Sequence, residues 1–160
     1  MNNFKPKQNT QDKLCNCKKK EDCPLGGQCL KKELIYQATV KCEGGETQNY
    51  VGLTANTFKE RYSGHNFNFN HQDSKGTTLS AHIWKLKNEN KRYEISWKIL
   101  EHAKPFTPTN EQCALCTAEK KIIIYQPEKA TLNTRNELGA HCKHKQSRLL
   151  FKKPRLKDKT

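Results

Sequence analysis

The sequence has few apolar residues for its length. Only 33% of its 160 residues are hydrophobic, which is a low share for a globular chain. The first 30 residues hold almost none, and dense apolar runs occur only at 33–42, 79–86, 95–100 and 114–125. A chain of this kind can bury one modest core. We therefore expect one small domain between polar ends, with at most a small appendage, and exclude a large or multidomain fold.

The sequence also lacks membrane and export signals. No apolar run is long enough to cross a bilayer, and the N-terminal stretch "MNNFKPKQNTQDK" is too polar for a signal peptide. We therefore expect an intracellular protein with no membrane contact, in a reducing compartment. Its eight cysteines then indicate metal ligands or free thiols, because disulfides are rare there. Pairing of all eight is the alternative for an exported chain, and nothing in the sequence supports export.

Acidic residues are scarce beside basic ones. The chain has 16 Asp and Glu against 30 Lys and Arg, a formal charge of +14. The excess is spread through the chain and is densest in "KHKQSRLLFKKPRLKDKT" at 143–160. This charge favours a polyanionic partner, above all DNA, with a merely solvated basic surface as the simpler alternative. The tail is typical of a phosphate-contacting arm, a nuclear address or a disordered end.

Three segments have the pattern of strands. "ELIYQATVKC" (33–42) and "TQNYVGLT" (47–54) flank a Gly-Gly turn and predict an antiparallel hairpin. "YEISWKILEH" (93–102) alternates apolar and polar residues, which predicts a half-buried third strand. Helical spacing and capping residues predict helices within 54–67, 77–90 and 107–126, and a short one closed by Gly139.

These elements predict an α/β (α+β) fold. A small, mainly antiparallel three-stranded sheet would be flanked by helices. We divide the chain into a disordered lead (1–13), a cysteine-rich, zinc-binding appendage (14–30), a main domain (31–146) and a basic tail (147–160).

The first four cysteines have metal-ligand spacing. Cys15, Cys17, Cys23 and Cys29 are close enough in sequence to surround a tetrahedral Zn²⁺. A second site would combine Cys113 and Cys116 with Cys142 and His144, although cysteines near a helix start are also common as small core residues. A third possibility joins the upstream cysteines to histidines of the main domain. Cys42, at a strand end, is expected to be a packed thiol.

The stretch "QNYVGLTANTFKERYSGH" (48–65) holds candidates for chemistry on phosphates. Arg61 and His65 are four residues apart and share a helix face. Tyr50 precedes them, and Tyr36 is expected opposite Tyr50 in the hairpin. A solvated helix face and ordinary cross-strand packing are the simpler explanations.

Glu119 and Asn133 extend this set. Glu119 lies beside Leu115 and Ala118 in the most apolar helix, so its carboxylate needs a partner, and a divalent metal is the economical one. Asn133 follows in "TLNTR".

"LIYQA", "NYVGLT", Arg61, Glu119 and Asn133 together resemble the GIY-YIG nuclease family over about 33–137. Leu34 replaces the glycine of the first signature, whereas Tyr50-Val51-Gly52 is well kept. A narrower resemblance, to the endonuclease domain of Penelope-like retroelements, rests on "CNCKKKEDCPLGGQC", "TTLSAHIWKLK", "CALCTAEK" and "LNTRNELGAHCKHK". That domain usually follows a reverse transcriptase, which would be the partner in a parent polyprotein.

The resemblance implies a mechanism. Glu119 would bind one Mg²⁺ or Mn²⁺, and Arg61 would stabilise the pentacovalent phosphate. Tyr50 or Tyr36 would take the proton of the attacking water, with His65 assisting or replacing the tyrosine. An unperturbed tyrosine, with a pKa near 10, is a poor base at neutral pH. Nearby cations would therefore have to lower that pKa.

Other residues receive supporting roles. Asn133 would orient the metal site or the backbone, and Gly52 would let the chain turn into the helix. His71 and His82 are further candidates, His82 for packing or phosphate contact. We also predict DNA-phosphate contacts by Lys59, His82, Lys85, Lys87, Lys143, Lys145 and Arg148.

Three hypotheses follow for function. The first is a metal-dependent DNA endonuclease in the nucleus that nicks DNA and so provides a 3′-hydroxyl for target-primed reverse transcription of a retroelement. The second is an inactive zinc-containing module that binds nucleic acid. The third, an RNA-binding or structural zinc protein, explains the charge and the cysteines but not the surroundings of Glu119. The sequence favours the first, because all six expected catalytic residues are present. Target sequence and oligomeric state stay open.

Overall fold

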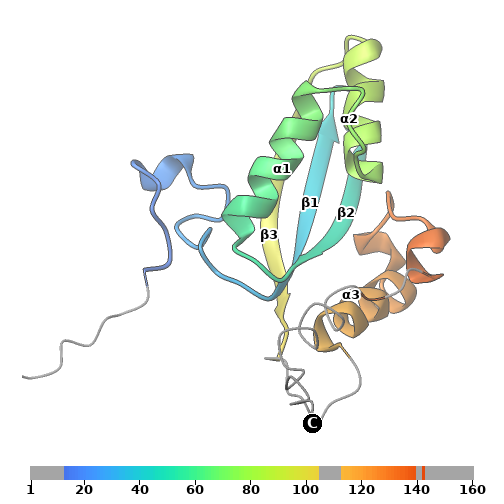
Figure 1. Ribbon diagram of the computed structural model, residues 1–160. Helices are drawn as coiled ribbons and strands as arrows, with labels where there is room; N and C mark the ends of the chain where they lie inside the picture. Colours follow the sequence, from blue (N-terminus) through green and yellow to red (C-terminus); the bar gives the residue numbers. More distant parts are fainter. Residues whose placement is uncertain (1–12, 105–112, 140–141, 143–160) are drawn as a thin grey trace, which may run out of the picture.

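The computed structural model describes residues 13–104, 113–139 and 142. Its centre is a three-stranded antiparallel sheet with the order β2-β1-β3 (Figure 1). The strands are β1 (Leu34–Cys42), β2 (Thr47–Thr54) and β3 (Tyr93–His102). The expected hairpin joins β1 to β2, and Gly44 and Gly45 in its turn have φ of 99° and 88°, values that glycine adopts without steric cost.

The strand register corrects one expectation. Tyr36 pairs with Gly52, and Tyr50 pairs with Ala38, so the two tyrosines are not directly opposite. Their positions differ by two residues, which places both side chains on the same face of the sheet as diagonal neighbours. The turn therefore sets a register in which a tyrosine faces a glycine.

Within the described ranges, three helices complete the fold: α1 (Phe58–Asn70), α2 (Thr78–Asn88) and α3 (Ala114–Tyr125). Thr57 and Thr77 cap α1 and α2, each accepting a backbone N–H bond at 3.3 Å, as short polar side chains do at helix starts. The expected start of the third helix at 107 lies outside the described residues; the helix begins after Cys113. Short 3₁₀ turns occupy Lys20–Asp22, Pro127–Lys129 and Arg135–Gly139.

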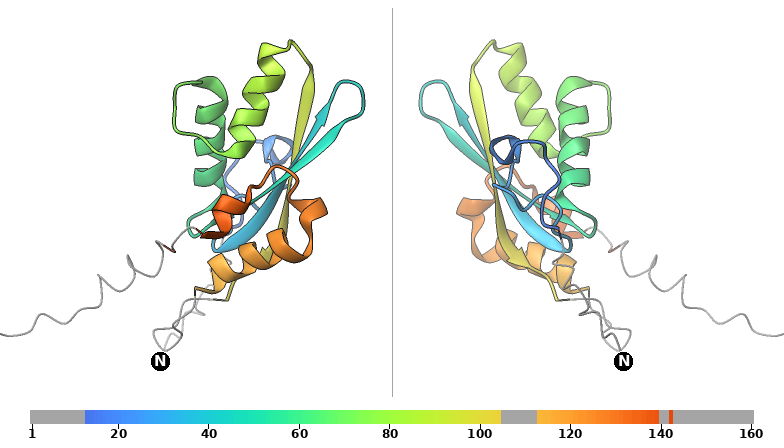
Figure 2. Two further views of the ribbon diagram at one scale, coloured as in Figure 1. Left: turned by 90° about the vertical axis from the view of Figure 1, so that its right-hand side faces the viewer. Right: turned by 90° about the vertical axis from the view of Figure 1, so that its left-hand side faces the viewer.

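The helices cover both faces of the sheet. On one face Tyr36 and Ala38 pack with Phe58 of α1 and with Leu79 and Ile83 of α2. On the other face Ile35 and Val51 pack with apolar residues of α3, namely Leu115, Ala118 and Ile122 (Figure 2). Because β1 is central, its residues from Leu34 to Ala38 are all buried. The α+β class with a small antiparallel sheet is thus confirmed.

The cysteine-rich segment is packed against this domain. The carbonyls of Cys29 and Lys31 accept the backbone N–H groups of Lys59 and Phe58 at 2.8 and 3.0 Å, so they satisfy N–H groups in the first turn of α1. Cys23 and Cys29 are buried in the same cluster as the core residues of the first face. The segment expected to be an appendage is therefore continuous with the core.

Among the described residues none forms a helix that combines the length and the apolar character needed to cross a bilayer.

Candidate active site and metal centres

Tyr36, Arg61 and His65 form one buried hydrogen-bonded chain. The Tyr36 hydroxyl lies 2.7 Å from Nε2 of His65 and accepts a hydrogen bond from Nε of Arg61 at 3.1 Å. Arginine only donates, so the Tyr36 hydroxyl accepts from Arg61 and has its own proton to donate to His65 Nε2. The proton of the imidazole is then on Nδ1, which has no partner among the described residues. The chain positions Arg61 on α1 against the sheet.

Burial dominates the ionisation of these groups. Burial, and then the charge of Arg61, lower the pKa of His65 to about 3. Burial raises the pKa of Tyr36 to about 12 and that of Tyr50 as well, although the charge of Arg61 opposes both. Arg61 therefore acts in the direction expected from the sequence, but its effect is the smaller one. Both tyrosines and His65 are neutral at pH 7.

Gly52 has a steric role that differs from the expected one. It lies inside β2 and not at a turn into the helix, so the turn role is wrong. A Cβ atom at this position would be 2.3 Å from the Tyr36 hydroxyl oxygen, far inside van der Waals contact. Glycine is needed because the Tyr36 side chain lies across β2 on its way to His65 and Arg61.

Tyr50, Arg61 and Glu119 line one hollow of about 560 Å³ beside residues 53–56, where β2 ends and the chain leads to α1. They come from β2, α1 and α3, so three separate elements meet there. Burial, and then the nearby Glu137, raise the pKa of Glu119 to about 7, although Arg61 opposes this. Tyr36 is wholly buried and is not among the lining residues. Of the two tyrosines, Tyr50 is thus the one that faces the hollow.

The donors at this hollow fit a hard divalent cation. Mg²⁺ is commonly bound by one or two carboxylates while keeping waters and taking phosphate oxygens from a substrate. Glu119 supplies one carboxylate, and a cation there would relieve its repulsion with Glu137. Within the described part of the chain, the only groups of three or more close metal-binding side chains consist of cysteines. A metal at Glu119 would therefore depend on substrate and water for its other ligands.

Asn133 links the backbone of β2 to Glu137. Its side chain accepts from Val51 N and donates to Val51 O, both at 2.8 Å, and it donates to Glu137 Oε2 at 2.7 Å. Thr78, at the start of α2, also donates to Glu137 at 3.4 Å. Glu137 is not among the site residues that the sequence predicts. The one sequence feature that could have indicated a role for Glu137 is its position four residues after Asn133.

Several predicted phosphate contacts have protein partners. The Lys59 amine donates to Asn16, and the Lys87 amine donates to the Phe69 carbonyl. His71 stacks on Phe67, with ring centroids 4.0 Å apart. His82 is half-buried, which lowers its pKa. Lys143, Lys145 and Arg148 lie outside the described residues.

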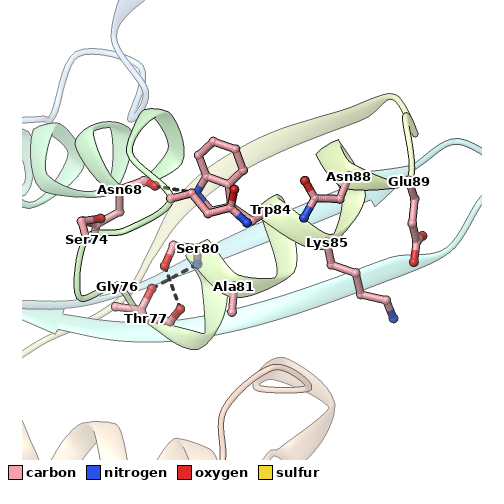
Figure 3. A pocket seen from close by; sticks show the side chains of 11 residues that line it. Asn68, Ser74, Gly76, Thr77, Ser80, Ala81, Trp84, Lys85, Asn88 and Glu89 are labelled. Atoms are coloured by element: carbon pink, nitrogen blue, oxygen red, sulfur yellow. Dashed lines mark hydrogen bonds between the residues drawn. The ribbon is translucent and has the colours of Figure 1, made fainter.

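Lys85 lines a polar hollow between α1 and α2 (Figure 3). Trp84 lies at this hollow and donates from Nε1 to the carbonyl of Asn68 at 2.8 Å, while the Lys87 amine sits 4.6 Å from its ring centre. The indole is thus held from two sides and belongs mainly to the packing of α1 against α2.

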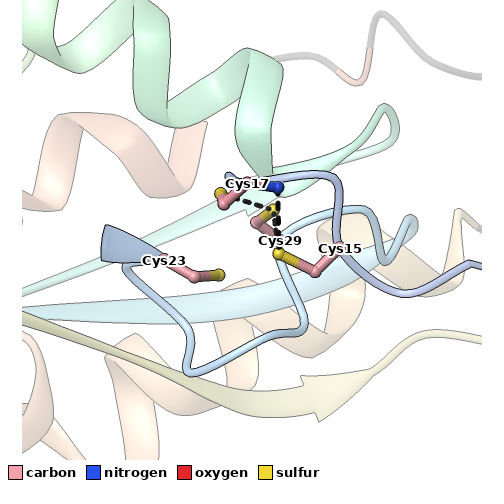
Figure 4. Close-up of side chains that lie close together, drawn as sticks. All are labelled: Cys15, Cys17, Cys23 and Cys29. Atoms are coloured by element: carbon pink, nitrogen blue, oxygen red, sulfur yellow. Dashed lines mark hydrogen bonds between the residues drawn. The ribbon is translucent and has the colours of Figure 1, made fainter. Parts of the chain in front are cut away.

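Cys15, Cys17, Cys23 and Cys29 converge as predicted, with their sulfur atoms all within 4.8 Å of one another (Figure 4). The sulfur of Cys29 lies 3.6 Å from that of Cys15 and 3.8 Å from that of Cys17. Tetrahedral zinc with Zn–S bonds of about 2.3 Å requires sulfur separations of about 3.8 Å. The cluster therefore fits a structural zinc ion that is bound by four cysteines, and no histidine of the described residues belongs to the group.

The thiols of this cluster differ in acidity. Burial raises the pKa of Cys29 to about 12. Burial also disfavours the thiolate of Cys23, but N–H groups of Gly27 and Leu25 lower its pKa to about 6. Such N–H donors stabilise a sulfur ligand that has lost its proton.

A second cluster contains Cys113, Cys116 and Cys142, again within 4.8 Å of one another. Cys113 is the residue before α3, so this cluster ties the start of that helix to the end of the described chain. Three thiols could hold a metal with one further ligand. His144, the predicted fourth ligand, lies outside the described residues. No disulfide joins any of the eight cysteines, and Cys42 is buried in the core as expected.

Comparisons with known proteins leave the family open. A scan against protein-family models, a search of curated proteins and a search of solved structures each found no match.

Proposed function

We propose that this protein is a divalent-metal-dependent DNA endonuclease of the GIY-YIG type that nicks its substrate. The observation that carries the proposal is the meeting of Tyr50, Arg61 and Glu119 at one hollow, from three different elements. Arginine, a carboxylate for a metal and a group able to exchange a proton are the parts that phosphodiester hydrolysis needs. The charge of +14 supports DNA as the substrate.

Each residue has a role that its position supports. The guanidinium of Arg61, held by Tyr36, stabilises the charge that develops on the phosphate. Tyr50 lines the hollow. Because burial raises its pKa, it would accept a proton from the attacking water only if a cation at Glu119 lowered that pKa. His65 keeps Tyr36 and Arg61 in place. A Mg²⁺ or Mn²⁺ ion at Glu119 would supply Lewis-acid stabilisation of the phosphate and the leaving oxygen. Water adds to phosphorus as the bond to the 3′ oxygen breaks, and that oxygen leaves as a hydroxyl.

The biological setting rests on the four sequence segments that resemble Penelope-like retroelements. In that setting the released 3′-hydroxyl primes reverse transcription of the element, the reverse transcriptase belongs to the same polyprotein, and the protein acts in the nucleus. The alternative is a module that binds nucleic acid without cutting it.

Nicking of a supercoiled plasmid tests the proposal. With Mg²⁺ or Mn²⁺ the wild type should convert it to the open circular form. Glu119→Gln should lower the rate at least about 100-fold, because the metal and its charge stabilisation are lost. Glu94→Gln, a matched change at an exposed residue of β3, should leave the rate unchanged.

The outcomes separate the two readings of the site. Equal nicking by wild type and Glu119→Gln would show that the activity comes from elsewhere and would contradict the proposal. A wild type that binds DNA but never nicks it with either metal would instead support the inactive binding module.

A further inference from the structure

A further hollow, of about 780 Å³, lies at the start of α1. Its charged lining is basic, and no acidic residue contributes to it. The lining residues are Lys13, Leu14, Leu30, Lys31, Lys32, Thr57 and His102. None of them was among the DNA contacts predicted from the sequence.

The cysteine cluster brings the lysines of this hollow together. Lys13 precedes the cysteine-rich segment and Lys31 and Lys32 follow it, so they are far apart along the chain. Leu30 N donates to Leu14 O at 2.9 Å, and the sulfur atoms of Cys15 and Cys29 are 3.6 Å apart. Each of these contacts joins the start of the cysteine-rich segment to its end. The basic hollow thus exists because the loop is closed.

The other side of the hollow comes from the sheet and from α1. His102 ends β3 and pairs with Leu34. The free N–H groups at a helix start could themselves bind an anion, but those of α1 are occupied by the carbonyls of Cys29 and Lys31 and by Thr57 Oγ1. The lysines therefore supply the anion-binding charge, and the helix dipole adds to it.

This hollow adjoins the candidate active site. Thr57 lines the basic hollow, and Asn56, the residue before it, lines the hollow of Arg61 and Glu119. A DNA strand carries a phosphate at each nucleotide, so a strand cut at Glu119 that runs across Asn56 and Thr57 would bring another phosphate to the basic hollow. The lysines that line the hollow attract such a phosphate and release its counterions.

We propose that the basic hollow binds a backbone phosphate of DNA beside the cut site, and that metal binding by Cys15, Cys17, Cys23 and Cys29 assembles it. The identity of the ligand as DNA rests on the proposed function. The cysteine cluster then controls DNA affinity and takes no part in the chemistry.

Binding of a fluorescein-labelled 20-base-pair duplex, followed by anisotropy at several salt concentrations without Mg²⁺, tests the phosphate site. Lys13→Ala with Lys32→Ala should weaken binding about 10-fold near 0.1 M salt and lower the salt slope by about 1, the value for one lost phosphate contact. The control, Lys41→Ala with Lys91→Ala, removes the same charge from a hollow at the hairpin end that also contains Glu43 and Glu94. It should change affinity less than about 2-fold.

A double-mutant cycle tests the role of the cysteine cluster. Cys17→Ala, or removal of zinc by a chelator, should weaken DNA binding by a factor similar to that of the lysine pair, and added Zn²⁺ should restore the chelated wild type. Combined with the lysine pair, Cys17→Ala should weaken binding less than about 2-fold further, because both changes remove one site. Limited proteolysis of each full-length variant, followed for cleavage within 31–104, shows whether the main domain stays folded.

The results distinguish this inference from the proposed function. An unchanged salt slope in the lysine pair, in a protein that nicks, overturns the inference alone. If the fold-changes in DNA affinity caused by Cys17→Ala and by the lysine pair multiply in the combined variant, the two changes act independently. This result would overturn the role of the cluster in assembling the hollow. If the lysine pair lowers the salt slope of DNA binding as expected but the wild type never nicks DNA, only the proposed function is overturned.

Discussion

At the scale of residues, the interior around Tyr36 is organised by neutral polar groups. Its hydroxyl contacts both His65 and Arg61, and the imidazole of His65 is only 1% exposed. Rings of Trp97 and Phe69 pack against this imidazole, with centroids 5.4 and 6.0 Å away. Protonating His65 would place a second cation next to Arg61 in an apolar setting, which is costly.

This cost predicts a pH dependence of stability. His65 has a folded pKa of about 3 against an ordinary 6.5. The unfolded chain therefore binds more protons below pH 6.5, and the stability from neutral His65 is complete above pH 6.5 and is lost as the pH falls toward 3. Between pH 7.5 and 5 the loss should be about 2 kcal/mol. Urea unfolding at each pH, compared with His65→Phe, should show this difference.

The comparison with the variant is needed because Glu119 acts in the opposite direction. Its pKa is raised to about 7, so its contribution falls as the pH rises from about 4.5 toward 7. This term is common to both proteins and cancels in the difference. An NMR titration of the His65 ring in the wild type gives a direct check. A midpoint near 6.5 would contradict the prediction.

At the scale of elements, the segment after α3 completes the outer edge of β2. Leu132 N donates to Asn49 O at 2.8 Å, and Asn49 N donates to Thr131 Oγ1 at 2.7 Å. Further along, Asn133 pairs with both backbone groups of Val51 as a neighbouring strand would. Unpaired strand edges are costly when buried and invite association when exposed. The segment satisfies these groups and places Glu137 near Glu119.

Asn133→Asp should destabilise the protein through this edge. The new oxygen cannot donate to Val51 O, and the added charge lies beside Glu137. Loss of one hydrogen bond and an unsatisfied carbonyl cost about 1–3 kcal/mol in the free energy of unfolding. Urea unfolding measures this, and Asn88→Asp at an exposed position of α2 provides the control. Equal stability of the two variants would show that Asn133 does not support β2.

At the scale of the whole molecule, a cysteine cluster adjoins the start of each helix that contributes to the candidate site. Cys29 O accepts an N–H of α1, which bears Arg61, and Cys113 directly precedes α3, which bears Glu119. Only part of the chain is apolar, so metal centres would add stability that a small core does not supply. The two clusters would then fix both helices against the sheet.

Zinc content tests this arrangement. The purified protein should contain at least one zinc ion per chain by elemental analysis, and two if the second cluster is also filled. Cys29→Ala should remove one, whereas Cys42→Ala should remove none, because Cys42 belongs to neither cluster. The melting temperature should fall when zinc is chelated. A wild type without zinc would contradict the metal-binding role of both clusters.

The elements themselves were largely predictable from the sequence. Alternation around Trp97, the Gly-Gly turn and the capping threonines are local signals, and local backbone preferences decide such features. The grouping of Cys15, Cys17, Cys23 and Cys29 also followed from their spacing. No local feature of the sequence indicates that Arg61 and Glu119, which lie in different helices, line the same hollow.

The amino-acid order alone predicts the strands, the helices and the first cysteine cluster, because each depends on neighbours along the chain, and composition alone gives the basic charge. Contacts between distant segments were needed to show that Tyr36 faces Gly52, that Tyr50 and not Tyr36 lines the hollow, and that Lys13 lies beside Lys31. These depend on strand register and on contacts between distant segments. Burial also decided the ionisation of His65 and Glu119, because desolvation outweighs the charges that the sequence displays.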